Sequence, residues 1–180
     1  MTRLVPPDVR LRASLVDAMA DFAAVTQMHG SGFWHLGQGV WPDTGEQGMA
    51  ELVDLLRGFA DPARELDESL VHCDYLWITD GEPEQVIGFV AIRHTLNAFL
   101  LEEGGHIGYS VRPIRRREGH ATRALTLALD RAGELGIDRA LVTCDDDNEP
   151  SRRTIERNGG VLEDIRRGRR RYWIDTHSGR

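Results

Sequence analysis

The chain has 180 residues, a net charge of −7 at pH 7, and apolar and charged fractions of 41% and 28%, which are ordinary for a soluble globular protein. It contains no Lys, which excludes a Walker A phosphate loop and a Schiff-base nucleophile, and no G-x-G-x-x-G motif follows a strand pattern. Zinc-ligand spacing and an apolar run of membrane-spanning length are both absent, so we expect a cytoplasmic protein with no metal and no membrane partner.

The charge is divided unevenly along the chain. Residues 1–105 contain 6 Arg and 17 acidic residues, whereas residues 106–180 contain 16 Arg and 12 acidic residues. The basic second half suggests an anionic ligand. The acidic first half either attracts a cationic ligand or only spreads charge over the surface, and both interpretations stay open.

The N-terminal third predicts one short strand and two helices. Residues 9–12 alternate apolar and charged side chains as a strand does, while residues 14–28 and 47–58 have the apolar spacing of helices. The expected apolar faces are Leu15, Met19, Phe22 and Val25 or Thr26 on the first helix, and Met49, Leu52, Val53 and Leu56 on the second. The loop between the helices, residues 30–42, carries side chains that either line a ligand pocket or cover the core: Phe33, Trp34, His35 and Trp41.

An antiparallel hairpin is predicted next. Its strands are residues 69–79 and 86–95, joined by the turn sequence Asp80-Gly81-Glu82-Pro83. Residues 96–105 predict irregular chain, and residues 106–111 predict a third strand that Pro113 ends. The two cysteines, Cys73 and Cys144, lie in apolar, strand-like stretches and predict buried thiols rather than a disulfide or a nucleophile.

A strand–helix–strand unit follows and predicts a parallel strand pair. The helix over residues 119–135 has an apolar stripe at steps of four and three, Gly136 suits its left-handed stop, and residues 140–144 form the second strand. The stripe consists of Ala121, Leu125, Ala128, Ala132 and Leu135.

The last part of the chain predicts one more helix and a closing hairpin. Asn148 can cap the helix, and Gly159-Gly160 ends it. Strands over residues 161–165 and 171–174 then pair across Arg167-Gly168-Arg169.

Arg115-Arg116-Arg117 directly precedes the long helix. Three cations there oppose the partial positive charge of the helix N-terminus, which makes sense if an anion docks in the loop. Gly119 allows the backbone and a ligand to approach closely, and the free N–H groups of the first turn can bind phosphate oxygens. The sequence therefore predicts a site for a cofactor that carries a pyrophosphate.

The order of hairpin, strand, R-x-x-G-x-A loop, long helix and parallel strand resembles the GNAT superfamily of acyl-CoA-dependent N-acetyltransferases. The loop residues are Arg116, Gly119 and Ala121, and the resemblance covers roughly residues 70–175. More specifically, residues 117–122 and 143–148 resemble a bacterial subgroup of predicted acetyltransferases. The resemblance implies an α/β (α+β) fold: a mixed, mostly antiparallel sheet with a central parallel strand pair and helices on both faces.

The resemblance also implies how acetyl-CoA is held. The loop and first helical turn would bind the pyrophosphate through Arg116, Arg117, Glu118, Gly119, His120, Ala121 and Thr122. The backbone of Ser110 and Val111 would pair with the pantetheine arm, and Asn148 and Ser151 would contact it from the opposite side. The amide of Tyr109 would polarise the acetyl carbonyl in an oxyanion-hole role.

Acetyl transfer to an amine needs a general base, because an ammonium has no lone pair. His106 and Glu103 precede the strand that resembles the cofactor strand, where a base can stand. The alternatives are a half-exposed strand residue for His106, and a solvated loop for Glu102 and Glu103. Many relatives protonate the leaving thiolate with a Tyr on the following helix; Ile155 occupies that position here. Since thiols have a pKa near ~8.5, a water can serve instead.

Two charged clusters have two interpretations each. Asp145-Asp146-Asp147 either binds a cationic acceptor or Mg²⁺, or forms a capping loop. The arginines between 166 and 171 suggest either nucleic-acid binding or a solvated hairpin, and the acidic balance of the chain favours the hairpin.

These observations predict one acetyltransferase domain over residues 1–180, with residues 1–68 shaping the acceptor side and residues 69–176 forming the sheet and the CoA-binding core. The predicted reaction moves an acetyl group from acetyl-CoA to a primary amine of a small molecule or an exposed amino group, by direct attack in a ternary complex. No nucleic-acid partner is expected, and the sequence leaves open whether the protein forms a homodimer. The alternative is a non-catalytic acyl-CoA sensor on the same fold.

Overall fold

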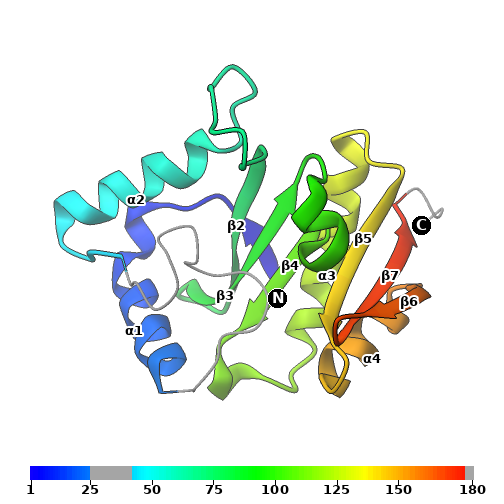
Figure 1. The fold of residues 1–180 in the computed structure, drawn as a ribbon. Helices are drawn as coiled ribbons and strands as arrows, with labels where there is room; N and C mark the ends of the chain where they lie inside the picture. Colours follow the sequence, from blue (N-terminus) through cyan, green and yellow to red (C-terminus); the bar gives the residue numbers. More distant parts are fainter. Residues whose placement is uncertain (25–41, 177–180) are drawn as a thin grey trace.

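The computed structural model describes residues 1–24 and 42–176 and contains a seven-stranded sheet in the order β1-β2-β3-β4-β5-β7-β6 (Figure 1). Among these residues, only β4 and β5 are parallel neighbours. The strands are β1 (Arg3–Val5), β2 (Cys73–Asp80), β3 (Gln85–Arg93), β4 (Ile107–Val111), β5 (Arg139–Asp145), β6 (Val161–Arg166) and β7 (Arg169–Asp175). The helices are α1 (Arg12–Ala23), α2 (Glu46–Gly58), α3 (His120–Glu134) and α4 (Glu149–Arg157), with short helical turns η1 (Val9–Leu11), η3 (Leu100–Gly104) and η4 (Pro113–Arg115).

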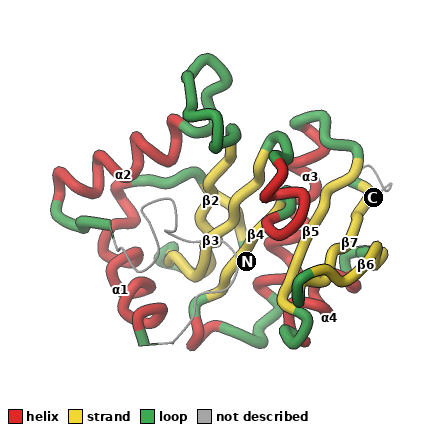
Figure 2. Tube along the Cα trace, viewed as in Figure 1, coloured by secondary structure: helices red, strands yellow, loops and turns green. Residues whose placement is uncertain are grey.

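Helices cover both faces of the sheet (Figure 2). On one face, α3 and α4 bury Leu125, Leu129 and Ile155 in a core shared with β3, β4, β5 and β7. On the other face, α1 and α2 pack on Trp77 and Phe89 of the β2–β3 hairpin. The mixed, mostly antiparallel sheet with one parallel pair and two helical layers confirms the expected fold class. None of the helices in the described residues is long and apolar enough to cross a membrane.

The predicted strand over residues 9–12 is wrong. The first strand is Arg3–Val5, and residues 9–11 form η1, which leads directly into α1. The reason is local: the Asp8 carboxylate accepts the Arg10 amide at 2.9 Å and starts a helical turn, which the alternating pattern does not reveal. Helix α1 ends at Ala23, and the last part of the predicted helix, residues 25–28, lies outside the described residues. The same holds for the loop residues Phe33, Trp34, His35 and Trp41.

The segment predicted as irregular, residues 96–105, contains the helical turn η3. The Asn97 side chain accepts the Leu100 amide at 2.9 Å, and the Gly105 amide closes the turn on the Leu100 carbonyl at 2.6 Å. Leu100 is buried, which anchors the turn. The single apolar anchor explains why no helical period was visible in the sequence.

The other predicted helices and strands are present, although their first and last residues differ from those expected. The hairpin forms, but β2 begins at Cys73, because the Asp67 carboxylate accepts the Ser69 amide in a separate turn. Both cysteines are free and buried, and burial raises the pKa of Cys73 to about 12 and that of Cys144 to about 11.

The long helix is also as predicted. Its stripe faces the core, with Leu125, Ala128 and Ala132 fully buried and Ala121 and Leu135 packed at the margin. Gly136 follows it in the left-handed conformation, at φ 80°.

Candidate active site

The parallel strands β4 and β5 form a wedge, because their pairing stops after one register position, Ile107 opposite Val142. Beyond it, β4 pairs only with β3 and β5 pairs only with β7. Strand β4 leads into the loop before α3, and β5 leads into α4. The facing edges of β4 and β5 are thus joined at one end and unpaired toward the starts of α3 and α4.

Hydrogen-bond alternation shows which residues of β4 face the wedge. The amide of Arg93 donates to the carbonyl of His106, and the amide of Arg112 donates to the carbonyl of Ile87, so the even-numbered residues between them bond to β3. Ser110 therefore directs its backbone to β3, which differs from its expected pairing with pantetheine. Tyr109 and Val111 direct their backbone groups into the wedge.

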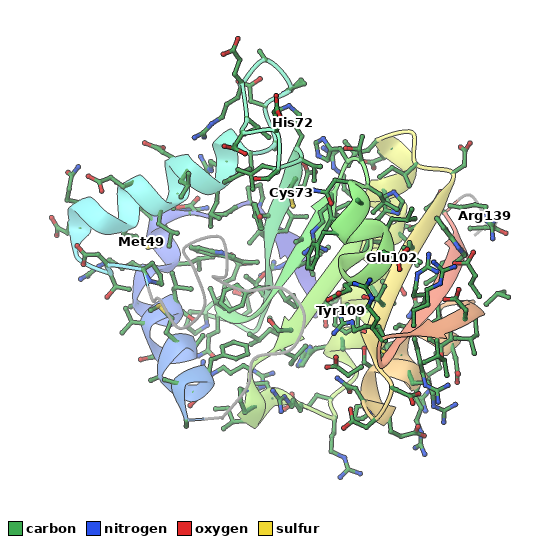
Figure 3. The ribbon with its side chains drawn as sticks, viewed as in Figure 1. Met49, His72, Cys73, Glu102, Tyr109 and Arg139 are labelled. Atoms are coloured by element: carbon green, nitrogen blue, oxygen red, sulfur yellow. The ribbon has the colours of Figure 1, made fainter. Side chains whose placement is uncertain are left out.

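A pair of hydroxyl groups crosses the wedge from β4 to α4. The hydroxyl of Tyr109 lies 2.9 Å from the Ser151 hydroxyl, and Figure 3 shows Tyr109 on β4. Asn148 accepts the Ser151 amide at 3.1 Å and thereby caps α4, as the sequence predicts. Burial raises the pKa of Tyr109 above its ordinary value, so its hydroxyl stays protonated at neutral pH.

The loop before α3 presents a run of backbone donors. Arg117 and Gly119 both have positive φ, 67° and 85°, which turns the chain sharply into the helix. In the described part of the chain, nothing accepts a hydrogen bond from the amides of residues 117–122. Residues 116–119 are exposed, and a side chain at Gly119 would meet no atom within 4 Å. The geometry suits a diphosphate, because free amides at a helix N-terminus attract anions.

The three arginines of this loop have different partners. Arg115 is held by the carboxylates of Glu118 and Asp80, at 3.0 and 3.1 Å, so its charge is already compensated. Arg116 donates from Nε to the Val111 carbonyl at 3.1 Å and ties the loop to the end of β4. Arg117 is exposed and makes no ion pair with a described residue. The cluster thus has one structural arginine, one that braces the loop, and one available for a ligand.

His120, the first residue of α3, is buried and lies beneath the loop. Its Nδ1 lies 2.9 Å from the Thr2 hydroxyl, and its Nε2 lies 3.2 Å from the Glu118 carboxylate. Ala121 and Thr122 continue the first turn and are partly buried. These side chains support the loop, whose amides have no acceptor among the described residues.

The two candidate bases lie in different surroundings. Glu103 is in η3; its carbonyl accepts the Thr143 hydroxyl of β5 at 2.5 Å, and its carboxylate is 37% exposed and 3.7 Å from Arg167. His106 is buried at the closed end of the wedge, and its Nδ1 accepts the Leu141 amide at 2.9 Å. Burial, aided by nearby Arg93, lowers the pKa of His106 to about 4.

The acidic and basic clusters compensate one another. Asp145 pairs with Arg169 at 2.5 Å and Asp146 pairs with Arg170 at 2.7 Å. Arg166 contacts Glu102 at 3.0 Å, a residue labelled in Figure 3. Ion pairs from the β6–β7 hairpin to the end of β5 and to η3 therefore compensate Asp145, Asp146 and these arginines. In residues 1–24 and 42–176, no group of three or more side chains could hold a metal ion.

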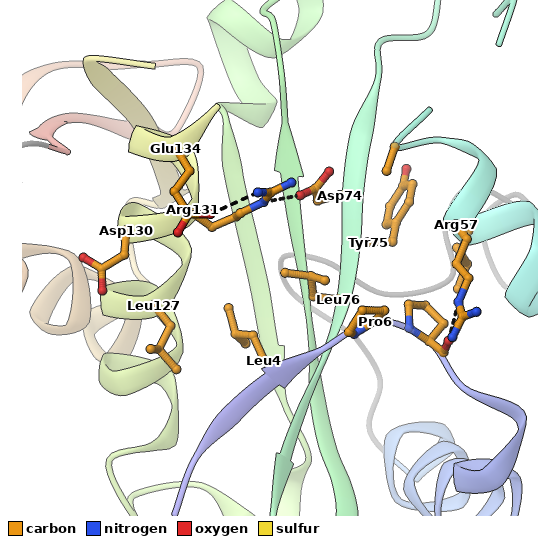
Figure 4. A pocket seen from close by; sticks show the side chains of 13 residues that line it. Leu4, Pro6, Arg57, Asp74, Tyr75, Leu76, Leu127, Asp130, Arg131 and Glu134 are labelled. Atoms are coloured by element: carbon orange, nitrogen blue, oxygen red, sulfur yellow. Dashed lines mark hydrogen bonds and ion pairs between the residues drawn. The ribbon is translucent and has the colours of Figure 1, made fainter. Parts of the chain in front are cut away.

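A cavity of about 610 Å³ lies apart from the wedge, between β1, β2, α2 and α3 (Figure 4). Asp74 and Arg131 meet at its wall at 2.7 Å. None of the residues predicted for the site lines this cavity.

The sequence matches the family model of the acetyltransferase (GNAT) domain over residues 18–161. The chain therefore belongs to the GNAT family of acetyltransferases, a family whose activity depends on acyl-CoA. The resemblance that the sequence motifs carry is confirmed. A search of curated proteins by sequence found no match.

Solved structures share the fold at low sequence identity. RimJ from Mycobacterium smegmatis, in complex with CoA-disulfide, is 20% identical, with 96% of this chain and 80% of that chain covered and a TM-score of 0.65. MccE, the microcin C7 self-immunity acetyltransferase in complex with acetyl-CoA and AMP, is 17% identical, with coverage of 97% and 92% and a TM-score of 0.63. A putative ribosomal-protein-serine acetyltransferase from Vibrio cholerae is 17% identical, with coverage of 97% and 93% and a TM-score of 0.61.

Sequence reasoning missed two features of the site. Arg123 stands one helical turn after Gly119, exposed and without a described ion-pair partner, and its i+4 spacing from Gly119 could have indicated it. The contact between the Tyr109 and Ser151 hydroxyls joins residues 42 positions apart, and no local pattern signals it.

Proposed function

We propose that this protein transfers an acetyl group from acetyl-CoA to a primary amine, by direct attack in a ternary complex. The observation that carries the proposal is the run of unpartnered amides from Arg117 to Thr122, which begins in the exposed loop 116–119, after the unpaired edge of β4. The acceptor is a small-molecule amine or an exposed amino group of a peptide. The family membership and the acetyl-CoA complex of MccE support this choice.

The residues present fit acetyl-CoA. The amides of residues 117–122 would bind the diphosphate, and Arg117 would add a positive charge. The amide of Val111, on the wedge edge of β4, would pair with the pantetheine arm, while Asn148 and Ser151 stand on the opposite side. Bound acetyl-CoA supplies a thioester whose carbonyl carbon is open to attack by an amine.

Tyr109 would act twice in the reaction. Its amide would donate to the acetyl carbonyl oxygen, where negative charge develops as the amine attacks. Its hydroxyl, with that of Ser151, would donate a hydrogen bond to the departing sulfur. The thiolate finally gains the proton that the amine loses, so the reaction needs no other reactant.

Glu103 is the base that the geometry favours, acting through a water molecule. Its carboxylate is part-exposed, and its nearest described cation, Arg167, lies at 3.7 Å, too far for a direct hydrogen bond. His106 suits this role less well, because its Nδ1 lone pair already accepts the Leu141 amide.

We also propose that residues 1–180 act as one domain. The ion pair of Asp21 on α1 with Arg112, at the end of β4, supports a contribution of the N-terminal helices to the site. A cytoplasmic location and the absence of nucleic-acid partners remain expectations from composition.

The test is release of free CoA from acetyl-CoA in the presence of a broad panel of amines, detected by a thiol reagent. We expect release that depends on both the amine and the protein, with acetylated product confirmed by mass spectrometry. Saturable acetyl-CoA binding without release for any amine would contradict the catalytic proposal.

That second outcome is the prediction of the alternative, a non-catalytic acyl-CoA sensor. Ile155 favours it, because the position where many relatives carry the proton-donating Tyr is fully buried and apolar here. A melting-temperature increase with CoA, in the absence of turnover, would establish the sensor instead.

A further inference from the structure

His106 joins three strands at the closed end of the wedge. Its amide donates to the Leu141 carbonyl at 2.7 Å, and the Leu141 amide donates to its ring Nδ1 at 2.9 Å. Its carbonyl accepts the Arg93 amide of β3 at 2.8 Å. His106 thus bonds to both the carbonyl and the amide of Leu141, the two backbone groups that Leu141 directs toward β4.

The surrounding backbone is arranged to bring the ring to this position. Gly105 has φ 66°, and a Cβ there would lie 2.6 Å from the Leu141 carbonyl oxygen, so only glycine fits between the strands. The Arg93 guanidinium donates to the carbonyls of Gly104 and Gly105, both at 3.1 Å. The chain therefore enters β4 along a fixed route that places His106 against Leu141.

The contact replaces part of a strand ladder. In a regular parallel pair, a strand amide bonds to a carbonyl of its neighbour. Here the Leu141 amide bonds to a side chain instead, and regular pairing lasts for only Ile107 and Val142. The two strands are therefore fastened at one end, next to the ring, and nowhere further along β4.

We propose that His106 is a positioning residue whose ring clamps Leu141 and fixes the opening of the wedge, and thereby the placement of the Tyr109 amide relative to Ser151. This inference rests on the proposed function, since the wedge matters only if it receives the acyl arm. It gives His106 a role other than that of the general base.

The state of the ring agrees with this role. Burial and Arg93 lower the pKa of His106, so the ring is neutral at pH 7, and acceptance at Nδ1 places its proton on Nε2. The Trp173 ring packs edge-on at 6.3 Å between centroids. A neutral ring in this tautomer can hold the Leu141 amide permanently.

Three variants distinguish a His106 ring that holds the Leu141 amide from a His106 ring that acts as the general base. In His106→Asn, the side-chain oxygen takes the place of Nδ1 and can accept the Leu141 amide, whereas His106→Gln puts it one carbon further out and His106→Leu removes it. We expect the Asn variant to keep kcat, KM and the pH profile within about threefold. We expect the Gln and Leu variants to lose about tenfold or more in kcat/KM, because the buried Leu141 amide loses its partner and β5 is no longer held against β4 at this point.

An Asn variant as inactive as the Leu variant, with one limb of the pH profile gone, would overturn the proposal in favour of a base. Equal activity of all three variants would overturn it as well. Circular dichroism shows whether each variant is folded.

A second measurement does not depend on turnover. Nitrogen-15 NMR of the wild-type protein should show Nδ1 unprotonated and Nε2 protonated, and hydrogen exchange at the Leu141 amide should be slow in wild type and His106→Asn but faster in His106→Leu. Unchanged exchange in His106→Leu would refute the clamp, whatever the activity. If exchange responds as expected but no amine is acetylated, the proposed function fails and the clamp stands.

Discussion

Gly119→Asp separates the stability of the loop from its affinity for an anion. Gly119 is the N-cap of α3 at φ 85°, and a Cβ at this position would have no other atom within 4 Å. The left-handed conformation costs a non-glycine residue about 1–2 kcal/mol. A carboxylate at this N-cap recovers about 1 kcal/mol through capping and the helix dipole. The free energy of unfolding should therefore change by about 1 kcal/mol or less.

The effect on ligand binding is much larger. A carboxylate about 5 Å from one phosphate charge, at an effective dielectric of about 20, is repelled by about 3 kcal/mol. Isothermal titration calorimetry with acetyl-CoA should show a loss of affinity of about 100-fold or more. The loss should shrink at high salt, because the added charge is exposed.

Gly119→Asn is the matched control, since it has nearly the same shape and carries no charge. Gly136→Asn controls for the backbone, because Gly136 has φ 80° and similar open space at the other end of α3. We expect Gly136→Asn to bind acetyl-CoA as wild type does. The reasoning is refuted if Gly119→Asp and Gly119→Asn bind acetyl-CoA equally well.

Three further predictions address the wedge, the remote ion pair and the buried histidine. Ser151→Ala should lower kcat by about 100-fold with little change in KM, if its hydroxyl serves the departing sulfur; stopped-flow thiol detection measures this, and an unchanged kcat would remove Ser151 from the chemistry. Asp74→Asn should lower the free energy of unfolding by about 2 kcal/mol, because it removes the carboxylate that contacts His94 at 2.8 Å and Arg131 at 2.7 Å; urea denaturation measures this. The same variant should leave the KM for acetyl-CoA unchanged, which steady-state kinetics measures. The folded pKa of His106, about 4, lies below its unfolded value of about 6.5, so its contribution to the free energy of unfolding is complete above pH 6.5 and falls by about 2–3 kcal/mol at pH 4.5. In urea, the free energy of unfolding of wild type minus that of His106→Asn should therefore decrease by this amount between about pH 7 and about pH 4.5, and a difference independent of pH would contradict this.

The sequence predicted the elements whose signals are local and repeated. The stripe through Leu125 and Ala128, the cap at Asn148 and the turn between β2 and β3 each depend on residues a few positions apart. The loop from Arg115 to Gly119 was predicted for the same reason, since a glycine and cations at a helix start are visible in one short stretch.

The sequence did not reveal contacts between distant segments. The bond from Leu141 to the His106 ring spans 35 positions, and it supports our proposal that this histidine positions the strands rather than acting as a base. The partners of Arg115 show the same limit: Asp80 lies 35 positions earlier, so an arginine that looked available for phosphate is compensated within the fold. The β4 register likewise decides that Tyr109 and Val111, rather than Ser110, face the wedge.

The most direct test of the account is a titration of isotope-labelled protein with coenzyme A, followed by backbone amide NMR. We predict the largest shifts at the amides of Arg117 to Thr122, with further shifts at Tyr109 and Val111 and none at Tyr75 or Arg131 in the separate cavity. Shifts confined to that cavity, or none at all at saturating coenzyme A, would contradict the central claim that the start of α3 and the edge of β4 hold the cofactor.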